Sequence, residues 1–169
     1  MNRPKIKLHK TWFDWLLELF TIAGILGAIL LLWLYYQELP SKVPIHFNWP
    51  SKDAQGLGEK HLLWSSPVIC TILAIGISVL NRFPWVFNYP VEINAENARL
   101  HYAQATQMLR LINLLIGLLC FWVTLLSIYD AQGKTLRGAA LLDSLFPIAF
   151  FALPILYLIK ISIKKRKTG

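Results

Sequence analysis

The chain has 169 residues, of which 56% are hydrophobic and only 15% are charged, and its formal net charge is +8. Soluble domains usually carry charged residues at about a quarter of their positions, so this composition excludes an ordinary soluble domain. The positive charge does not indicate a nucleic-acid partner, because the basic residues gather at the two ends of the chain. The composition therefore predicts a membrane protein.

Long uncharged runs predict the membrane-spanning segments. Three runs are each long enough to cross about 30 Å of hydrocarbon as a helix, and they cover residues 19–37, 62–81 and 111–129. A fourth run, 144–159, is shorter, but it extends back to residue 138 if Asp143 lies near a membrane surface. We expect an all-α integral membrane protein, a four-transmembrane-helix bundle forming a single domain over residues 1–169, with spans at about 13–37, 62–81, 106–129 and 139–160.

The distribution of basic residues predicts the topology. They precede the first span and follow the last, at Arg3, Lys5, Lys7, Lys10, Lys160, Lys164, Lys165, Arg166 and Lys167. Because cytoplasmic flanks are enriched in Lys and Arg, we expect both termini in the cytoplasm and a structured extracytoplasmic loop, residues 38–61, between the first two helices. The basic tail predicts contact with anionic lipid in the bilayer at Lys164, Lys165, Arg166 and Lys167, worth about 1 kcal/mol per charge.

Two acidic residues stand at the start of the first span. Asp14 and Glu18 share one helical face and lie close to the helix N-terminus, where the helix dipole favours negative charge. We interpret them as part of an interfacial first turn that faces Lys7 or Lys10. The alternative is a proton or cation site inside the bundle.

Small residues in the spans suggest packing roles. Gly24 and Gly27 narrow the first helix and could seat a neighbouring helix, although their spacing is Gly-x-x-Gly and not Gly-x-x-x-Gly. Cys70 and Cys120 both fall inside uncharged runs, where a thiol usually acts as a small core residue. We expect Cys70 and Cys120 to act as small core residues as well.

The region before the third span contains two different patterns. Residues 81–90 alternate aromatic residues and prolines, which predicts an extended strip at the membrane interface. Asn94 then predicts a helix N-cap, and the following helix could run unbroken through the third span for about 35 residues. The N-terminal part of this helix is polar, and we call it the polar foot; it holds Arg99, His101, Gln104, Gln107 and Arg110. We expect His101 to be solvated, since no second metal ligand stands at the i+4 spacing.

The outer loop carries a recognisable pattern. It reads Leu39-Pro40-x-x-Val43-Pro44-x-His46-Phe47-Asn48, followed by Asp53, Gly56, Gly58 and Lys60. This run resembles the N-terminal domain of unknown function of the SdpI-like bacterial membrane proteins, and residues 90–97, Pro-Val-Glu-Ile-Asn-Ala-Glu-Asn, are similar to the segment ahead of that family's third helix. The chain departs from the pattern at Ser51, where the family usually has glycine.

The resemblance implies a location, a role and a set of residues. It implies a multi-pass protein of the bacterial cytoplasmic (inner) membrane, and the well-described role in the wider group is immunity to a secreted peptide toxin together with signalling. The binding residues that the loop motif implies are Pro40, Pro44, His46, Phe47, Asn48, Asp53 and Lys60.

The same loop can be interpreted from its chemistry alone. The prolines restrict the backbone after the first helix to an extended conformation. His46, Asn48 and Asp53 supply hydrogen-bond donors and acceptors that can close a turn. Such a loop could be a hydrogen-bonded cap over the outer end of the bundle. Alternatively, His46, Asp53 and His61 could form a metal or acid–base site, although no spacing here matches a known ligand rule.

Catalytic motifs are missing from the sequence. It has no Gly-rich phosphate loop, no Cys-x-x-Cys, no His-Glu-x-x-His and no Ser-His-Asp order. We therefore expect a non-enzymatic protein without metal or other cofactor that binds a toxin, peptide or protein partner. Two alternatives stay open: an accessory subunit of a larger membrane complex, and a transporter or membrane enzyme that uses the His46 and Asp53 loop, or Asp14, Glu18 and Asn113.

Overall fold

The fold consists almost entirely of helices. The computed structural model describes the backbone of residues 3–44 and 56–168, and the side chains of these residues except 160 and 162–168. The elements in chain order are α1 (Trp12–Tyr35), β1 (Lys42–Pro44), β2 (Leu57–Glu59), the 3-10 helix η1 (Lys60–Trp64), α2 (Ser65–Leu80), the 3-10 helix η2 (Pro84–Val86), α3 (Ala98–Ala131) and α4 (Ala139–Thr168). Within the described ranges, four helices are long and apolar enough to cross a membrane. This confirms the predicted all-α, multi-pass membrane protein.

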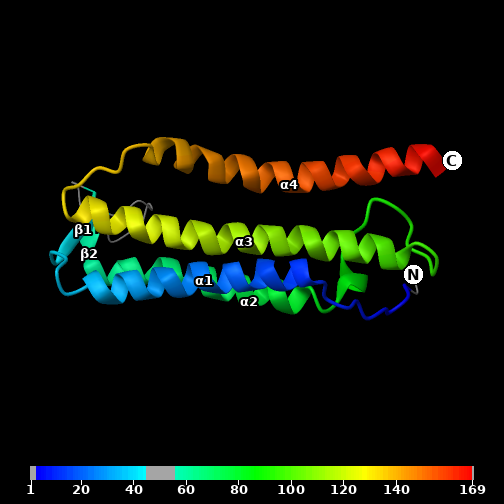
Figure 1. The fold of residues 1–169 in the computed structure, drawn as a ribbon, viewed down its shortest axis with the longest axis horizontal. Helices are drawn as coiled ribbons and strands as arrows, with labels where there is room; N and C mark the ends of the chain where they lie inside the picture. The colour runs from blue at the N-terminus through cyan, green and yellow to red at the C-terminus, as the bar shows by residue number, and fades with distance from the viewer. Residues whose placement is uncertain (1–2, 45–55, 169) are drawn as a thin grey trace.

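The helices lie lengthwise beside one another, and α3 is the central one (Figure 1). It packs against α1, α2 and α4. Half of the most apolar 18-residue stretch of α3 is buried in the bundle, whereas none of the corresponding stretch of α4 is buried. Both termini lie at one end of the bundle, which we call the terminal end, and the two short strands lie at the other, which we call the hairpin end (Figure 1).

A close crossing of glycines joins α1 to α3. A Cβ atom added to Gly24 would lie 2.5 Å from the carbonyl oxygen of Gly117, and one added to Gly117 would lie 2.6 Å from the carbonyl oxygen of Thr21. At Gly27 the added atom would meet the ring of Phe121 at 3.0 Å. Helices in lipid gain most from such close van der Waals packing, so the prediction that Gly24 and Gly27 seat a neighbouring helix is confirmed.

An apolar cluster closes the hairpin end. The strands pair antiparallel, with Val43 opposite Gly58. The buried members of the cluster come from α1, the loop, η1 and α3, and they are Leu32, Leu39, Val43, Leu63 and Ile128. The base of the loop between α1 and α2 is therefore packed onto the bundle.

A second cluster closes the terminal end. Its buried members are Tyr89, Ile93, Ala98, Tyr102 and Ala105. The N-terminal segment is tied to it, because the Arg3 guanidinium donates to the carbonyl oxygens of Trp85 and Phe87 and the Tyr102 hydroxyl donates to the carbonyl oxygen of Pro4 at 3.1 Å.

Three details at this end differ from the predictions. The strip 81–90 is not extended throughout, since η2 forms one 3-10 turn in which Pro84 is buried. The third helix begins at Ala98 and not after Asn94, because the Asn94 side chain accepts from the backbone N–H groups of Glu96 and Asn97 and so holds a turn ahead of the helix. The expectation that His101 is solvated was wrong, because His101 is buried in the structure, with only 8% of the residue exposed. The predicted unbroken helix is confirmed, with 34 residues.

Candidate functional site

The candidate site begins with the N-cap of α1. The Thr11 hydroxyl oxygen accepts from the Asp14 backbone N–H at 3.2 Å, and Asp14 Oδ2 accepts from the Thr11 backbone N–H at 2.8 Å and from its hydroxyl at 2.9 Å. This reciprocal capping box satisfies donors that a helix start otherwise leaves unpaired. It also fixes the Asp14 carboxylate so that its second oxygen points away from the cap.

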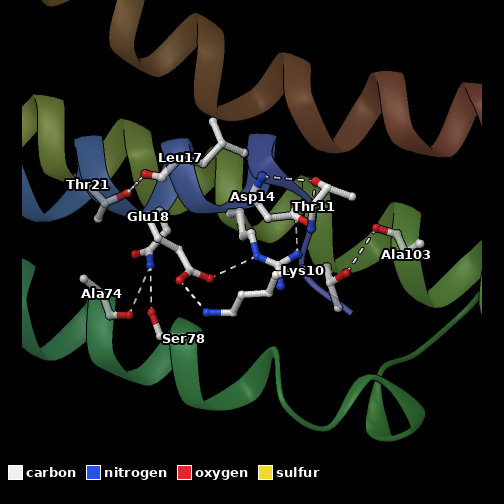
Figure 2. Close-up of polar contacts among 12 residues, drawn as sticks. Lys10, Thr11, Asp14, Leu17, Glu18, Thr21, Ala74, Ser78 and Ala103 are labelled. Carbon is white, nitrogen blue, oxygen red and sulfur yellow. Dashed lines mark hydrogen bonds and ion pairs between the residues drawn. The ribbon is translucent and has the colours of Figure 1, made fainter. Parts of the chain in front are cut away.

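That second oxygen meets an arginine of α3. Arg110 Nη1 donates to Asp14 Oδ1 at 3.1 Å, and Arg110 Nε donates to Glu18 Oε1 at 3.2 Å. Lys10 Nζ binds the other oxygen of Glu18 at 2.5 Å. Figure 2 shows Lys10, Asp14 and Glu18 converging from the start of α1. We call Lys10, Asp14, Glu18 and Arg110 the ion network.

The ion network is balanced in charge, and it is buried at Asp14 and Arg110, whereas the side chain of Lys10 is 38% exposed. The side chains of Arg110 and Asp14 are each only 9% exposed, and that of Glu18 is 24% exposed. Removing such charges from water is costly unless partners compensate them. Two carboxylates and two cations satisfy that condition, and the planar guanidinium spreads its donors over both acids.

The network marks the level at which the apolar part of the bundle begins. Glu18 is the last charged residue of α1 before an uncharged run, and Arg110 holds the same place in α3. The interpretation that Asp14 and Glu18 face Lys7 or Lys10 is correct for Glu18, which meets Lys10. It was wrong for Asp14, which meets Arg110 because α3 crosses beside the first turn of α1.

Arg110 is the member of the ion network that the sequence analysis misplaced. We expected it on the polar foot of the third helix, but it is buried against α1. A signal for this was present in the sequence, because Arg110 directly precedes a long uncharged run, as Glu18 does. An arginine there needs an acidic partner from another helix.

A second polar contact lies one turn further along α3. Asn113 Nδ2 donates to the carbonyl oxygen of Ala74 at 3.2 Å and to the Ser78 hydroxyl at 3.1 Å, which joins α3 to α2. Ala74 and Ser78 appear on α2 facing this contact in Figure 2. Polar bonds between helices stabilise membrane bundles modestly, by about 0.6 kcal/mol on average. The three helices are thus linked by polar contacts at one level.

The ion network holds α1 to α3, and we call this role the clamp. Each carboxylate of the network accepts from a cation, so neither Asp14 nor Glu18 is left as an uncompensated charge. In residues 3–44 and 56–159, no three His, Cys, Asp or Glu side chains lie close enough to hold a metal ion.

The two cysteines of these ranges, Cys70 and Cys120, are free thiols, and Cys120 is fully buried.

The structure places only part of the predicted loop site. His46, Phe47, Asn48 and Asp53 lie outside the described residues, as do the side chains of Lys164, Lys165, Arg166 and Lys167. Pro40 is exposed, and Pro44 is half-buried in β1 opposite Leu57. His61 is exposed on η1.

Lys60 has a definite structural role at the base of the loop. Its ammonium donates to the carbonyl oxygens of Tyr36 at 3.1 Å and Leu39 at 3.4 Å, and it lies 4.6 Å from the centre of the Tyr36 ring. These carbonyls follow the end of α1, where helix carbonyls lack intrahelical partners. Lys60 therefore ties the start of η1 to the end of α1.

Comparisons with protein-family models, with characterised proteins and with solved structures found no match to this chain. The resemblance of the loop between α1 and α2 to the SdpI-like proteins stays a prediction.

Proposed function

We propose that this chain is a non-enzymatic membrane protein that binds a toxin, peptide or protein partner through the loop between α1 and α2, as in SdpI-like immunity and signalling. In this proposal the chain belongs to a bacterial cytoplasmic membrane, with both termini in the cytoplasm. The hairpin end then faces outward, where a secreted peptide arrives.

One observation carries the proposal: the motif residues that can be located build an anchored base for the loop. Leu39 is 4% exposed and Val43 is fully buried, so the apolar members of the motif hold the loop to the bundle. Lys60, from the end of the same motif, donates to two carbonyl oxygens just beyond the end of α1. The pairing of β1 with β2 brings the ends of the intervening segment together. A rigid base that carries a variable loop is a common arrangement for binding surfaces.

Site-specific photo-crosslinking tests this proposal. A photoreactive residue is placed at Glu59, which is exposed on β2, in cells of the source organism. The matched control places it at Lys134, which is exposed on the α3–α4 loop. We expect a discrete adduct from Glu59 only, and we expect Lys60→Met to reduce it because the loop base loosens. Identical adducts from both positions, or none from either, would refute partner binding at the hairpin.

A survival assay addresses the immunity role. A sensitive bacterial host expressing the chain is challenged with secreted peptide fractions, and Lys60→Met is compared with Lys134→Met. Protection that is lost only in Lys60→Met agrees with immunity at this loop. Equal survival with and without the chain, for every fraction, contradicts it.

A second candidate function is an accessory subunit of a membrane complex, and α4 favours it. This helix exposes large apolar side chains along its length, including Leu141, Leu145, Ile148, Phe151 and Ile155. Trp122 Nε1 of α3 donates to Asp143 Oδ1 of α4 at 2.8 Å and so holds the start of α4 in place. A crosslinker at Phe151 is compared with one at Ile72 of α2, which is similarly exposed. Protein adducts from Phe151 alone agree with a lateral partner, and lipid adducts alone from both contradict it.

A further inference from the structure

A basic cavity opens beside the ion network at the terminal end. It has a volume of about 400 Å³ and lies among the N-terminal segment, α1, the end of α2 and α3. Its charged lining residues are Lys7, Lys10, Glu18, Arg82 and Arg110. Four of these are basic and one is acidic, which makes the cavity attractive to anions.

The ion network accounts for only half of this positive charge. Lys10 and Arg110 are matched by Glu18 and Asp14. Lys7 and Arg82 are both exposed, and no ion pair joins either of them to another residue that the structure describes. Two positive charges are therefore in excess, one from the N-terminal segment and one from the end of α2.

An apolar groove continues directly from this cavity. It has a volume of about 440 Å³ and shares Glu18, Ser78 and Arg82 with the cavity. From there it runs between α1 and α2, where it is lined by aliphatic side chains that include Ile22, Leu26, Ile29, Ile75 and Val79. Charged and polar groups at one end and hydrocarbon along the remainder match the two parts of an amphiphile.

The depth of the shared residues matches the headgroup level of a bilayer. Arg82 is the first Lys or Arg after the uncharged run of α2, and Glu18 is the last charged residue before the run of α1. Both therefore stand where hydrocarbon gives way to headgroups. Basic pockets between membrane helices at this depth can hold lipid phosphates.

We propose that the cavity and groove together bind one anionic phospholipid. Its phosphate lies between Lys7 and Arg82, and an acyl chain occupies the groove between α1 and α2. The charge excess selects an anionic headgroup over a zwitterionic one. The groove selects a whole lipid over a soluble phosphate.

Native mass spectrometry of the full chain tests the proposal. The protein is purified from mixed micelles of equimolar phosphatidylcholine and phosphatidylglycerol, and the retained lipids are identified. We compare the wild type with Lys7→Gln/Arg82→Gln and with the control Lys134→Gln/Arg137→Gln, which removes two exposed basic residues at the hairpin end. Each basic side chain near a membrane surface changes anionic-lipid binding about fivefold, so retention of phosphatidylglycerol should fall about twenty-five-fold in the first variant. It should be unchanged in the control.

A groove variant and a soluble probe separate a lipid from its headgroup alone. Val79→Trp fills the groove at an exposed position of α2 and should reduce phosphatidylglycerol retention while leaving the basic residues intact. Glycerol 3-phosphate should not displace the lipid at equal concentration. Equal retention of both lipids, an equal loss in the control variant, or binding of glycerol 3-phosphate as tight as that of the lipid would each overturn the proposal. Because this site lies at the opposite end from the hairpin, its failure leaves the proposed partner binding untouched.

Discussion

Replacing Arg110 by methionine is the most direct test of the ion network. The substitution keeps an unbranched side chain of similar length, but it removes the only described cation beside Asp14 and one of the two beside Glu18. Both carboxylates stay where they are, and the Asp14 side chain is only 9% exposed. Breaking a buried ion pair by removing one partner costs about 3–5 kcal/mol, because the other charge is left uncompensated. We expect a loss of free energy of unfolding in that range.

The cost should depend on which partner is removed. Asp14→Asn keeps the volume of the side chain and leaves Arg110 paired with Glu18, so we expect a loss of only about 1–2 kcal/mol. Thr11→Ala reports the capping contribution of the same turn, about 1 kcal/mol, and serves as the control for α1 fraying. Arg110→Lys should recover only part of the stability, since one ammonium cannot reproduce the two separate bonds of the guanidinium.

A double-mutant cycle in mixed micelles measures the coupling directly. Unfolding is followed by tryptophan fluorescence against denaturing detergent for Arg110→Met, Asp14→Asn and the double variant. Residues that share one network couple by about 0.5–3 kcal/mol, so the double variant should lose less stability than the sum of the single variants. The clamp interpretation is wrong if the free energy of unfolding of Arg110→Met lies within about 0.5 kcal/mol of the wild-type value. It is also wrong if the losses of the two single variants simply add in the double variant.

Two further predictions concern the helix crossing and the topology. Gly24→Ala places a Cβ atom 2.5 Å from the backbone of Gly117 and should destabilise the bundle by about 1–3 kcal/mol in the same unfolding assay. Gly76→Ala meets nothing within 4 Å and should be neutral or stabilise by up to about 1 kcal/mol, so equal effects of the two changes would contradict the close crossing. In a cysteine-free background, Ser41→Cys at the hairpin end and Asn88→Cys at the terminal end should react with a membrane-impermeant maleimide from opposite sides of intact membranes. Labelling of both from one side would exclude a spanning arrangement with the two ends on opposite faces.

The sequence alone determines the class of this protein and the approximate positions of its long helices. An uncharged run long enough to cross the hydrocarbon satisfies all of its backbone polar groups within one segment when it forms a helix. The long third helix is predictable for the same kind of local reason, since nothing between Ala98 and Ala131 interrupts the 3.6-residue pattern. Gly24 and Gly27 are recognisable as a contact surface, because small residues in a membrane helix serve close approach.

Only the tertiary structure decides which distant residues meet. Arg110 and Asp14 are 96 positions apart, and no local spacing rule relates them. The partner of Gly24 is another glycine on α3, and a single small residue gives no periodic signal of its own. The same holds for the basic cavity, which Lys7 of the N-terminal segment and Arg82 beyond the end of α2 line together. Local patterns set which segments enter the membrane, but the register and crossing of α1 against α3 set which charges compensate one another there.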